Sequence, residues 1–362
     1  MDLAVTEAVA MQRALDLAWR GWGRVQPNPL VGAVVLDAGG AAIGEGWHAE
    51  FGGPHAERVA LAAAEGRARG ATLVVSLEPC AHQGKQPPCT EAVLAAGIRR
   101  VIYAHEDPHP DARGGADRLR EAGLEVTAGL LREAVAAQNA PFFHALGRQD
   151  RPWVALKLAT SLDGRLADWQ GRSRWISGPE AREFVHWLRA GVDAIGIGGA
   201  TARADDASLT VRGSVEPRIA PRRVVFDRIG NLPATLTLLR TAREIPTTVV
   251  AGPLLNSDRA AALEAAGVQL VRSAGLADGL GILRRQGIQS LLIEGGGQLA
   301  GALLADGLVD RFYWVQSPLW LGESGVPAMP GLPGVDLAQA ERWKVVDRRP
   351  LGEDTLLVVD RR

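Results

Sequence analysis

Four residues in the first quarter of the chain have the types and spacing of a catalytic metal site. His55 and Glu57 stand at the start of a predicted helix, in the triplet His-Ala-Glu. Cys80 and Cys89, the chain's two cysteines, follow a predicted strand in the loop PCAHQGKQPPC (79–89). Zinc takes imidazole and thiolate ligands, and a catalytic site keeps three protein ligands and one open position for water. The sequence therefore predicts one zinc ion per chain, held by His55, Cys80 and Cys89.

Glu57 lies two residues after the histidine, where a carboxylate can act on bound water. Zinc lowers the pKa of such water to about 7, and the carboxylate can carry the released proton to a ring nitrogen and to departing ammonia. The order His-x-Glu, Pro-Cys, Cys is typical of zinc deaminases of nucleobases, in which the glutamate is not a ligand. The two cysteines are nine positions apart, farther than in that pattern. We expect Glu57 to be the catalytic residue.

The long loop between the cysteines resembles the deaminase domain of the bifunctional riboflavin-biosynthesis deaminase/reductases. It fits the pattern Pro-Cys-x-x-x-Gly-x-x-Pro-Pro-Cys, and PNPLVGAVV (27–35) and Gly46-Trp47-His48 fit the same family. The resemblance implies a pyrimidine substrate with a ribosyl 5′-phosphate. It also implies that Asn28 and His48 contact the pyrimidine and that Lys85, with His82 beside it, contacts the phosphate. The alternatives are a supporting or solvent-facing His82 and a solvated Lys85.

The second half carries a further series of motifs. Ser161-Leu162-Asp163-Gly164-Arg165 ends a predicted strand, and Trp175-Ile176-Ser177-Gly178 opens a helix. DAIGIGGATARADDASLTVR (193–212) and LLIEGGGQLAGALL (291–304) follow. In this order the motifs resemble the reductase domain of the same family, which has a dihydrofolate-reductase-like fold. The resemblance covers almost the whole chain and implies an NADPH cofactor.

Two glycine clusters suit a phosphorylated dinucleotide. Gly196, Gly198 and Gly199 are expected to follow a strand and to allow close approach of phosphates. They do not form the Gly-x-Gly-x-x-Gly fingerprint, so a Rossmann domain is disfavoured. Gly295-Gly296-Gly297 begins a predicted helix whose first amides can hold an anion. A tight strand-to-helix turn without a ligand is the alternative.

The resemblance also assigns residues to the two ligands of the reductase half. NADPH would be lined by Thr160, Ile176, Thr201, Asp205, Gly296, Gly297, Gln298, Leu299, Ala300, Gly301 and Ala302. The sugar-phosphate substrate would be held by Arg174, Arg189, Leu209, Arg212 and Glu294.

Lys157 lies in the middle of an apolar strand, where an unpaired lysine would be costly. We expect it either to pair with Asp163 or Glu294 or to face the active cleft and bind substrate, and we favour the cleft. Two positions depart from the family: Ala207 stands where Pro is frequent, and Arg311 where an acidic residue is more usual. Both departures bear on cofactor affinity.

The elements that must position these residues alternate between strand and helix patterns, which predicts an α/β protein. We expect a cytidine-deaminase-like α/β/α sandwich over 1–146, after an opening helix from Met1 to Arg20. The polar segment GRQDRP (147–152) reads as a linker, and a dihydrofolate-reductase-like α/β domain should fill 153–362. Within it, strands are predicted at 153–161, 193–197, 223–226, 247–251, 290–293, 311–316 and 355–359, and helices at 179–190, 257–266, 276–286 and 297–305.

Composition excludes several classes of protein. The 362 residues have a net charge of −1, with no apolar run long enough to cross a membrane and no signal-peptide pattern. Two cysteines are not a disulfide scaffold, which favours the cytoplasm. The first 146 residues are net acidic, and no basic stripe suggests nucleic acid. We expect small phosphoribosyl pyrimidines as partners, and a homo-oligomer formed through the reductase domain. Only three lysines, Lys85, Lys157 and Lys344, stand against 37 arginines.

The expected function is hydrolytic deamination of a diaminopyrimidine phosphate, followed by NADPH-dependent reduction of its ribosyl group. Two other hypotheses remain open at this point. A nucleic-acid deaminase fused to a reductase-like domain would need a basic groove and aromatic platforms near the zinc. A structural zinc module on a nucleotide-sensing domain would need a fourth zinc ligand, for which His82 is the candidate.

Overall fold

A computed structural model describes residues 3–362 of the chain, which divide into two compact units, 1–147 and 148–362. The first two residues of the predicted opening helix lie outside the described residues. The helix is otherwise present as α1 and ends before a 3-10 turn, Trp19–Gly21. Among the described residues, no helix combines the length and apolar character needed to span a bilayer.

The first unit is built on a five-stranded mixed sheet of order β2-β1-β3-β4-β5. β1 runs antiparallel to β2 and β3, whereas β3, β4 and β5 are parallel to one another. The elements are α1 (Leu3–Ala18), β1 (Gly32–Leu36), β2 (Ala42–Trp47), α2 (Ala56–Ala63), β3 (Thr72–Leu77), α3 (Cys89–Ala95), β4 (Arg100–His105), α4 (Gly115–Glu121), β5 (Glu125–Ala128), α5 (Arg132–Gln138) and α6 (Ala140–Gly147).

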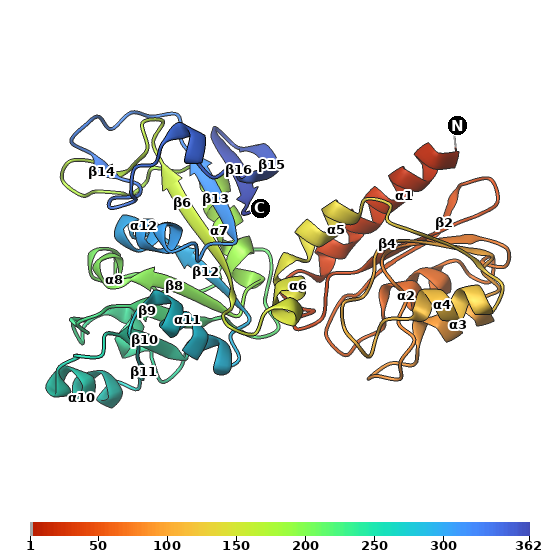
Figure 1. Cartoon of the computed structure of the whole chain (residues 1–362), viewed down its shortest axis with the longest axis horizontal. Helices are drawn as coiled ribbons and strands as arrows, with labels where there is room; N and C mark the ends of the chain where they lie inside the picture. Colours follow the sequence, from red (N-terminus) through yellow and green to blue (C-terminus); the bar gives the residue numbers. More distant parts are fainter. Residues whose placement is uncertain (1–2) are drawn as a thin grey trace. The chain divides into compact units, whose positions relative to one another are not determined.

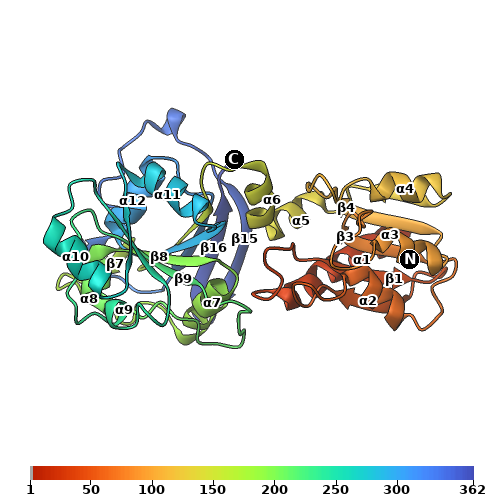
Figure 2. The ribbon, with the colours of Figure 1, turned by 90° about the horizontal axis from the view of Figure 1, so that it is seen from below.

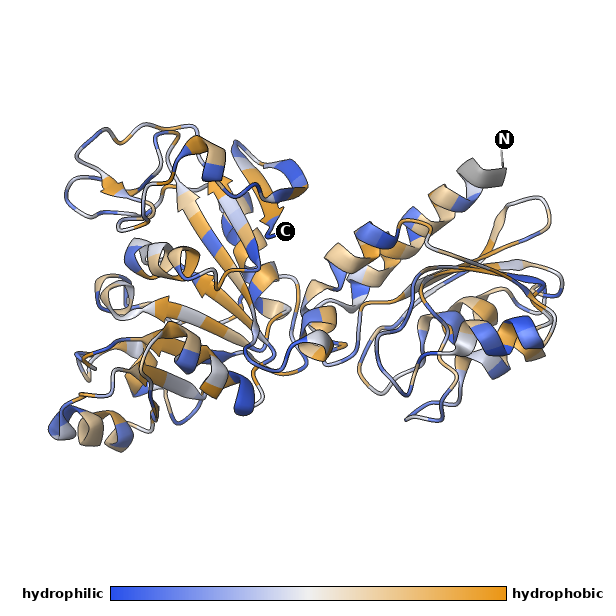
Figure 3. Ribbon diagram, in the orientation of Figure 1, coloured by the Kyte–Doolittle hydropathy of each residue, from blue (hydrophilic) through white to orange (hydrophobic). Residues whose placement is uncertain are grey.

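Helices cover both faces of this sheet because its central strands are apolar on both sides. Every residue of β1, Gly-Ala-Val-Val-Leu, is buried. Residues of α2, α3 and α4 pack on one face of the sheet, and residues of α1 and α5 pack on the other. Figure 1 shows the two helical layers, and Figure 3 shows the apolar strands between them. The unit is an α/β/α sandwich.

Two glycines bring α2 unusually close to β2. An added Cβ at Gly46 would lie 2.4 Å from the Ala60 nitrogen, and one at Gly44 would lie 2.3 Å from the Ala60 oxygen. The backbone of α2 therefore rests directly on the strand. Since His55 and Glu57 stand at the start of α2, these glycines set the position of both residues.

The second unit is built on a nine-stranded sheet of order β11-β10-β9-β8-β12-β6-β13-β16-β15. The strands from β11 to β13 are parallel, and β16 and β15 are antiparallel additions. The elements are β6 (Trp153–Thr160), β7 (Arg165–Ala167), α7 (Pro179–Ala190), β8 (Ala194–Gly198), α8 (Gly199–Asp205), β9 (Arg222–Phe226), α9 (Thr237–Arg240), β10 (Thr247–Ala251), α10 (Ser257–Ala265), β11 (Gln269–Arg272), α11 (Leu276–Arg285), β12 (Ser290–Glu294), α12 (Gly297–Ala305), β13 (Arg311–Gln316), β14 (Val326–Pro327), β15 (Lys344–Leu351) and β16 (Asp354–Asp360).

The core of this unit lies between the sheet and α11 and α12, where leucines of both helices meet the apolar strand residues. α7 packs on the opposite face, with Phe184 against Tyr313 at 6.0 Å between ring centroids. Figure 2 shows these helices on the two sides of the sheet. The segment before β6 is anchored here, because Arg151 makes two hydrogen bonds, of 2.6 and 2.7 Å, to Asp310.

One glycine expectation is wrong. Gly196 does not follow a strand but lies inside β8, and a Cβ there would come 2.7 Å from Ile293 Cδ1. Its small size serves packing between neighbouring strands. Gly198 ends β8 and Gly199 begins α8, so only these two stand where the chain leaves the sheet.

Candidate functional site

The zinc ligands predicted in the first unit lie at the ends of three neighbouring secondary-structure elements, α2, β3 and α3. His55 is the N-cap residue of α2, with extended backbone angles, and Glu57 lies in the first turn of that helix. Cys80 follows β3, and Cys89 begins α3. All of them stand at the same edge of the sheet. The fold thus converts a sequence separation of 34 residues between His55 and Cys89 into direct contact.

The three ligand atoms lie within 4.8 Å of one another. His55 Nδ1 is 3.6 Å from Cys80 Sγ and 3.2 Å from Cys89 Sγ. Hydrogen bonding from Cys89 lowers the pKa of Cys80 to about 4. One imidazole and two thiols, of which one is already inclined to ionise, are the donor set that fits zinc. Within the described chain, His82 is not part of this cluster, so the site has three protein ligands.

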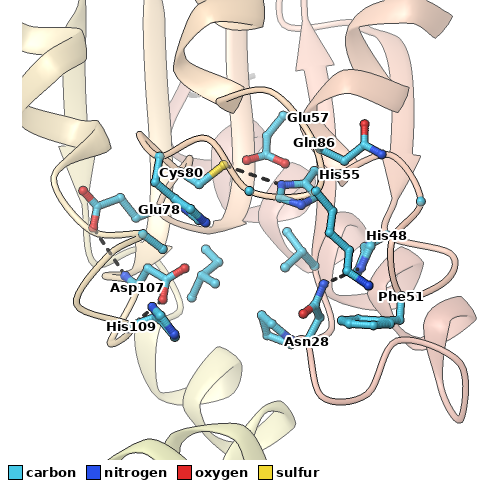
Figure 4. A pocket seen from close by; sticks show the side chains of 18 of the residues that line it. Asn28, His48, Phe51, His55, Glu57, Glu78, Cys80, Gln86, Asp107 and His109 are labelled. Carbon is cyan, nitrogen blue, oxygen red and sulfur yellow. Dashed lines mark hydrogen bonds between the residues drawn. The ribbon is translucent and has the colours of Figure 1, made fainter.

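Glu57 is almost completely buried, with 3% of its surface exposed. Burial raises the pKa of its carboxyl group. Figure 4 shows that the carboxylate points to the same place as His55 and Cys80. A buried carboxyl group with a raised pKa holds a proton more readily than an exposed one, which suits general acid–base catalysis.

Asn28 and His48 form a pair on one wall of the same pocket. His48 Nδ1 donates to the carbonyl oxygen of Pro54 at 3.0 Å, so Nε2 of the neutral ring accepts from Asn28 Nδ2 at 3.1 Å. Burial lowers the pKa of His48, which favours the neutral ring. The Asn28 amide is thereby held in one orientation.

The pocket encloses about 240 Å³ and is lined by seven of the eight deaminase-site residues predicted from the sequence. His82 contributes a buried Nδ1 that has no hydrogen-bond partner among the described residues. Lys85 is exposed at the pocket, with its Nζ 4.0 Å from the centroid of the Phe51 ring. The seven residues are Asn28, His48, His55, Glu57, Cys80, His82 and Lys85; the eighth, Cys89, is fully buried and does not line the pocket.

Sequence reasoning missed other residues of this pocket, among them five with polar or aromatic side chains. Phe51 lies beside Asn28 and His48, and Asp107 and His109 lie across from them (Figure 4). The other two are Gln86 and Phe142. The position of Asp107 and His109 directly after β4, a parallel neighbour of β3, is the signal that could have found them, because parallel strands end at one edge.

In the second unit, the carboxyl ends of β8, β12 and β6 lie side by side, because these strands are parallel neighbours. Gly295 and Gly296 make the turn from β12 into α12 with φ of +76° and +81°. A Cβ at Gly296 would lie 2.8 Å from Thr201 Oγ1 on α8. The start of α12 therefore lies so close to α8 that only glycine fits at position 296. Free backbone amides at such a helix start suit a phosphate of a dinucleotide.

Lys157 and Glu294 stand opposite each other in the pairing of β6 with β12. Burial lowers the pKa of Lys157, and the charge of Glu294 opposes that shift. Glu294 in turn accepts two hydrogen bonds from Arg189, of 2.6 and 2.7 Å. Asp163, the other expected partner, instead accepts from Ser161 and from backbone amides.

The remaining residues assigned to the reductase ligands fall into two groups. Arg174 donates to the Asp205 carbonyl and is exposed, as is Arg212, whose backbone amide donates to His186. Leu209 is buried with φ of +48°. The Thr160 side chain is fully buried and its hydroxyl accepts from Trp314 at 2.8 Å. The structure thus leaves the Thr160 hydroxyl covered.

Two family models match the chain. Residues 5–105 match the zinc-binding region of cytidine and deoxycytidylate deaminases. Residues 152–357 match the RibD C-terminal domain.

Similarity to individual proteins extends over both units. The riboflavin biosynthesis protein RibD of Aquifex aeolicus is 38% identical over 97% of each chain, and that of Escherichia coli is 39% identical over 96% of this chain and 97% of its own. The structure of Acinetobacter baumannii RibD superposes with a TM-score of 0.82 at 36% identity, covering 99% of both chains. A Thermotoga maritima diaminohydroxyphosphoribosylaminopyrimidine deaminase/5-amino-6-(5-phosphoribosylamino)uracil reductase gives 0.83 at 34% identity, also covering 99% of both.

These matches confirm the fold and the function expected from the sequence, including both cofactors. Zinc belongs to the deaminase domain and NADPH to the reductase domain. The chain belongs to the RibD family of bifunctional deaminase/reductases of riboflavin biosynthesis.

Proposed function

We propose that the first unit deaminates 2,5-diamino-6-ribosylamino-4(3H)-pyrimidinone 5′-phosphate. The second unit then reduces the ribosyl group of 5-amino-6-(5-phosphoribosylamino)uracil to ribityl with NADPH. The observation that carries the proposal is the buried Glu57 beside the His55, Cys80 and Cys89 donor set, in a pocket that also contains a lysine. The name of the Thermotoga maritima relative supports the two substrates.

In the deaminase site, His55, Cys80 and Cys89 would hold the zinc, which would lower the pKa of a bound water to about 7. Glu57 takes one proton of that water and delivers it to the pyrimidine ring nitrogen as the water oxygen adds to the carbon that carries the amino group. It then moves the remaining hydroxyl proton to that amino group, which leaves as ammonia when the C=O bond forms. The Asn28 amide, held by neutral His48, orients the ring. His82 offers its buried Nδ1 to the substrate, and Lys85 neutralises the phosphate.

In the reductase site, bound NADPH would supply a hydride to C1′ of the ribosyl group as the C1′–O4′ bond opens and O4′ takes up a proton, which leaves a ribityl chain. The Gly296 turn and the first backbone amides of α12 hold a cofactor phosphate, and the following residues to Ala302 lie beside it. Thr201 and Asp205 of α8 border the same place, with Ile176 on the loop before α7. The Thr160 hydroxyl already accepts a hydrogen bond from Trp314, so this buried residue stabilises the end of β6 beside the cofactor site.

For the sugar-phosphate substrate, the exposed guanidinium groups of Arg174 and Arg212 suit the phosphate. Arg189 is bonded to Glu294 and acts by orienting that carboxylate. Lys157 and Glu294, side by side on β6 and β12, contact the ribosyl hydroxyls. Leu209, which is buried, forms part of the wall of this substrate site.

We also propose that the functional domains are 1–146 and 153–362, joined by 147–152. The enzyme would be a homo-oligomer that assembles through the reductase unit. β15, an edge strand of the nine-stranded sheet with Val345 half exposed, supports this because edge strands offer unpaired backbone groups to a second copy. Two thiols that must stay reduced to bind metal support a cytoplasmic location.

The test is incubation of the enzyme with the diaminopyrimidine phosphate, followed by mass analysis. Without NADPH, replacement of an amino group by oxygen raises the substrate mass by about one unit. With NADPH, a further gain of about two units should follow. Release of ammonia from cytidine or a nucleic acid, with none from the phosphoribosyl pyrimidine, would contradict the proposal. So would a mass gain of two units without prior deamination.

A further inference from the structure

We propose that Phe51 is a positioning residue for the deaminase reaction. Its ring holds the Lys85 ammonium at the pocket and so contributes to the enzyme's preference for a phosphorylated substrate. This inference rests on the proposed function of Lys85 as the phosphate-binding residue. The observation that supports this inference is a cation–π contact, in which Lys85 Nζ lies 4.0 Å from the centroid of the Phe51 ring.

Without the Phe51 ring, little in the structure would hold the Lys85 ammonium in a position to bind the substrate phosphate. It lies in the loop between the two cysteines and is exposed. In the described part of the chain, no carboxylate lies within ion-pair distance of it. A flexible lysine loses much side-chain freedom when it binds a ligand. A cation 4.0 Å above an aromatic face is attracted to that face, and the ring therefore restricts the ammonium before substrate arrives.

Phe51 is itself held in place by its own segment. Its backbone amide donates to the Arg24 carbonyl at 3.1 Å, and Arg24 forms an ion pair with the adjacent Glu50 at 2.9 Å. Gly52 follows with φ of +86°, which turns the chain sharply. The ring is thus fixed at the edge of the pocket, next to Asn28 and His48 (Figure 4).

The loop that carries Lys85 is tied to the same segment. Gln86 Nε2 donates to the Gly52 carbonyl at 2.9 Å. A Cβ added to Gly52 would lie 3.7 Å from Lys85 Cδ, so the lysine stem passes directly over this glycine. The stacking and the Gln86 hydrogen bond act together to hold the ammonium on the pocket side. An ammonium with three donors can keep one face on the ring and present N–H groups to a phosphate.

The experiment compares the phosphorylated diaminopyrimidine substrate with its dephosphorylated form in the full-length zinc enzyme. Phe51→Leu should raise KM for the phosphorylated substrate about three- to five-fold. It should leave kcat, zinc content and KM for the dephosphorylated form unchanged. Phe51→Tyr keeps the aromatic face and should restore the wild-type KM. In a Lys85→Met background, Phe51→Leu should add no further increase.

Arg20 provides a matched control, because its guanidinium lies 4.7 Å from the Trp47 ring outside the pocket. Arg20→Met removes a cation–π contact of the same unit and should not change the ratio of the two KM values. An equal rise of KM for both substrates, or a rise that persists without Lys85, overturns the role of Phe51. If wild-type enzyme deaminates neither substrate, it is the proposed function that fails.

Discussion

At the scale of single residues, the deaminase site separates metal binding from proton transfer. His55, Cys80 and Cys89 offer the donor atoms, while the carboxyl group of Glu57 is buried beside them. Because Glu57, the proposed proton carrier, is not among the three donor residues, it can be replaced without removing a donor from the metal site. A substitution of Glu57 therefore tests proton transfer separately from metal binding.

Glu57→Gln should reduce ammonia release by a factor of at least about 100, since a positioned general base contributes that much or more. The amide is close in size to the carboxyl group but cannot accept the proton. Zinc content, measured by metal analysis, should stay at one per chain, and NADPH oxidation with the deaminated substrate should be unchanged. Normal ammonia release by this variant would show that another group carries the proton.

Lys157 predicts a pH dependence of stability. Burial lowers its pKa in the folded protein, so the unfolded chain binds more protons than the folded chain at alkaline pH. The free energy of unfolding should therefore rise as the pH increases toward the ordinary lysine pKa of about 10.4. Lys157→Met should remove this rise.

Urea unfolding of the wild type and the variant between neutral and alkaline pH measures the difference. Lys344→Met is the control, because Lys344 is exposed at the start of β15 and its removal should leave the rise unchanged. Parallel pH profiles for the wild type and Lys157→Met would contradict the assignment.

At the scale of elements, the contact of α2 with β2 decides where the catalytic residues stand. Gly46→Ala would place a Cβ 2.4 Å from the Ala60 nitrogen and 2.5 Å from the Ala56 oxygen. Backbone cannot yield as a flexible side chain does, so the helix must shift, at a cost of about 1–3 kcal/mol. We expect a lower unfolding midpoint and a loss of bound zinc.

Gly147→Ala is the matched control, since nothing lies within 4 Å of the added Cβ and its φ is not positive. It should keep the wild-type midpoint and zinc content. Full zinc occupancy in Gly46→Ala would mean that α2 does not govern the metal site.

Elements with local sequence signals were predictable to the residue. The helix expected at 179–190 is α7, because Pro179 suits its first turn and Gly191 its C-cap. The strand expected at 247–251 is β10, an apolar and β-branched run that is buried throughout. These boundaries follow from residues inside or next to the element itself.

β11 and β15 were missed because their residues do not carry the signal of a buried strand. β15 has the sequence KVVDRRPL, is mostly exposed and contains a proline. It is a strand because β16 pairs with it along its length. Such edge strands form only because the fold places a partner strand beside them.

The candidate site likewise contains residues that the local sequence marks and residues that only the fold brings together. Zinc ligands and Glu57 were predictable from spacing, since metal chemistry restricts the residue types. Phe51 was not, because a loop brings it to the pocket and nothing in its local sequence marks that location. Asp107 and His109 directly follow β4, but that signal is useful only once β4 is known to be a parallel neighbour of β3. The pairing of Arg189 with Glu294, across 105 positions, likewise depends on the sheet order.

At the scale of the whole molecule, each unit has its own core and its own site. The zinc ligands all lie within 1–147, and the elements assigned to NADPH all lie within 148–362. We expect the two units, expressed as separate chains, to fold independently. The first should bind zinc and release ammonia, and the second should oxidise NADPH with the deaminated substrate.

Circular dichroism and the two activity measurements check this expectation, with the intact chain as control. A first unit that binds no zinc, or a second unit that is inactive toward the deaminated substrate, would show that the halves depend on each other.

The scarcity of lysine gives this enzyme a built-in set of chemical labels. Lys85 lies at the deaminase pocket, Lys157 on the reductase sheet and Lys344 on an edge strand. An amine-reactive reagent therefore modifies very few side chains, each in a different place. Peptide mass mapping should show Lys85 protected by the phosphorylated pyrimidine and Lys344 labelled regardless of ligand. Occupancy of the deaminase pocket can then be followed at Lys85, with Lys344 as the internal reference, in one unmutated protein.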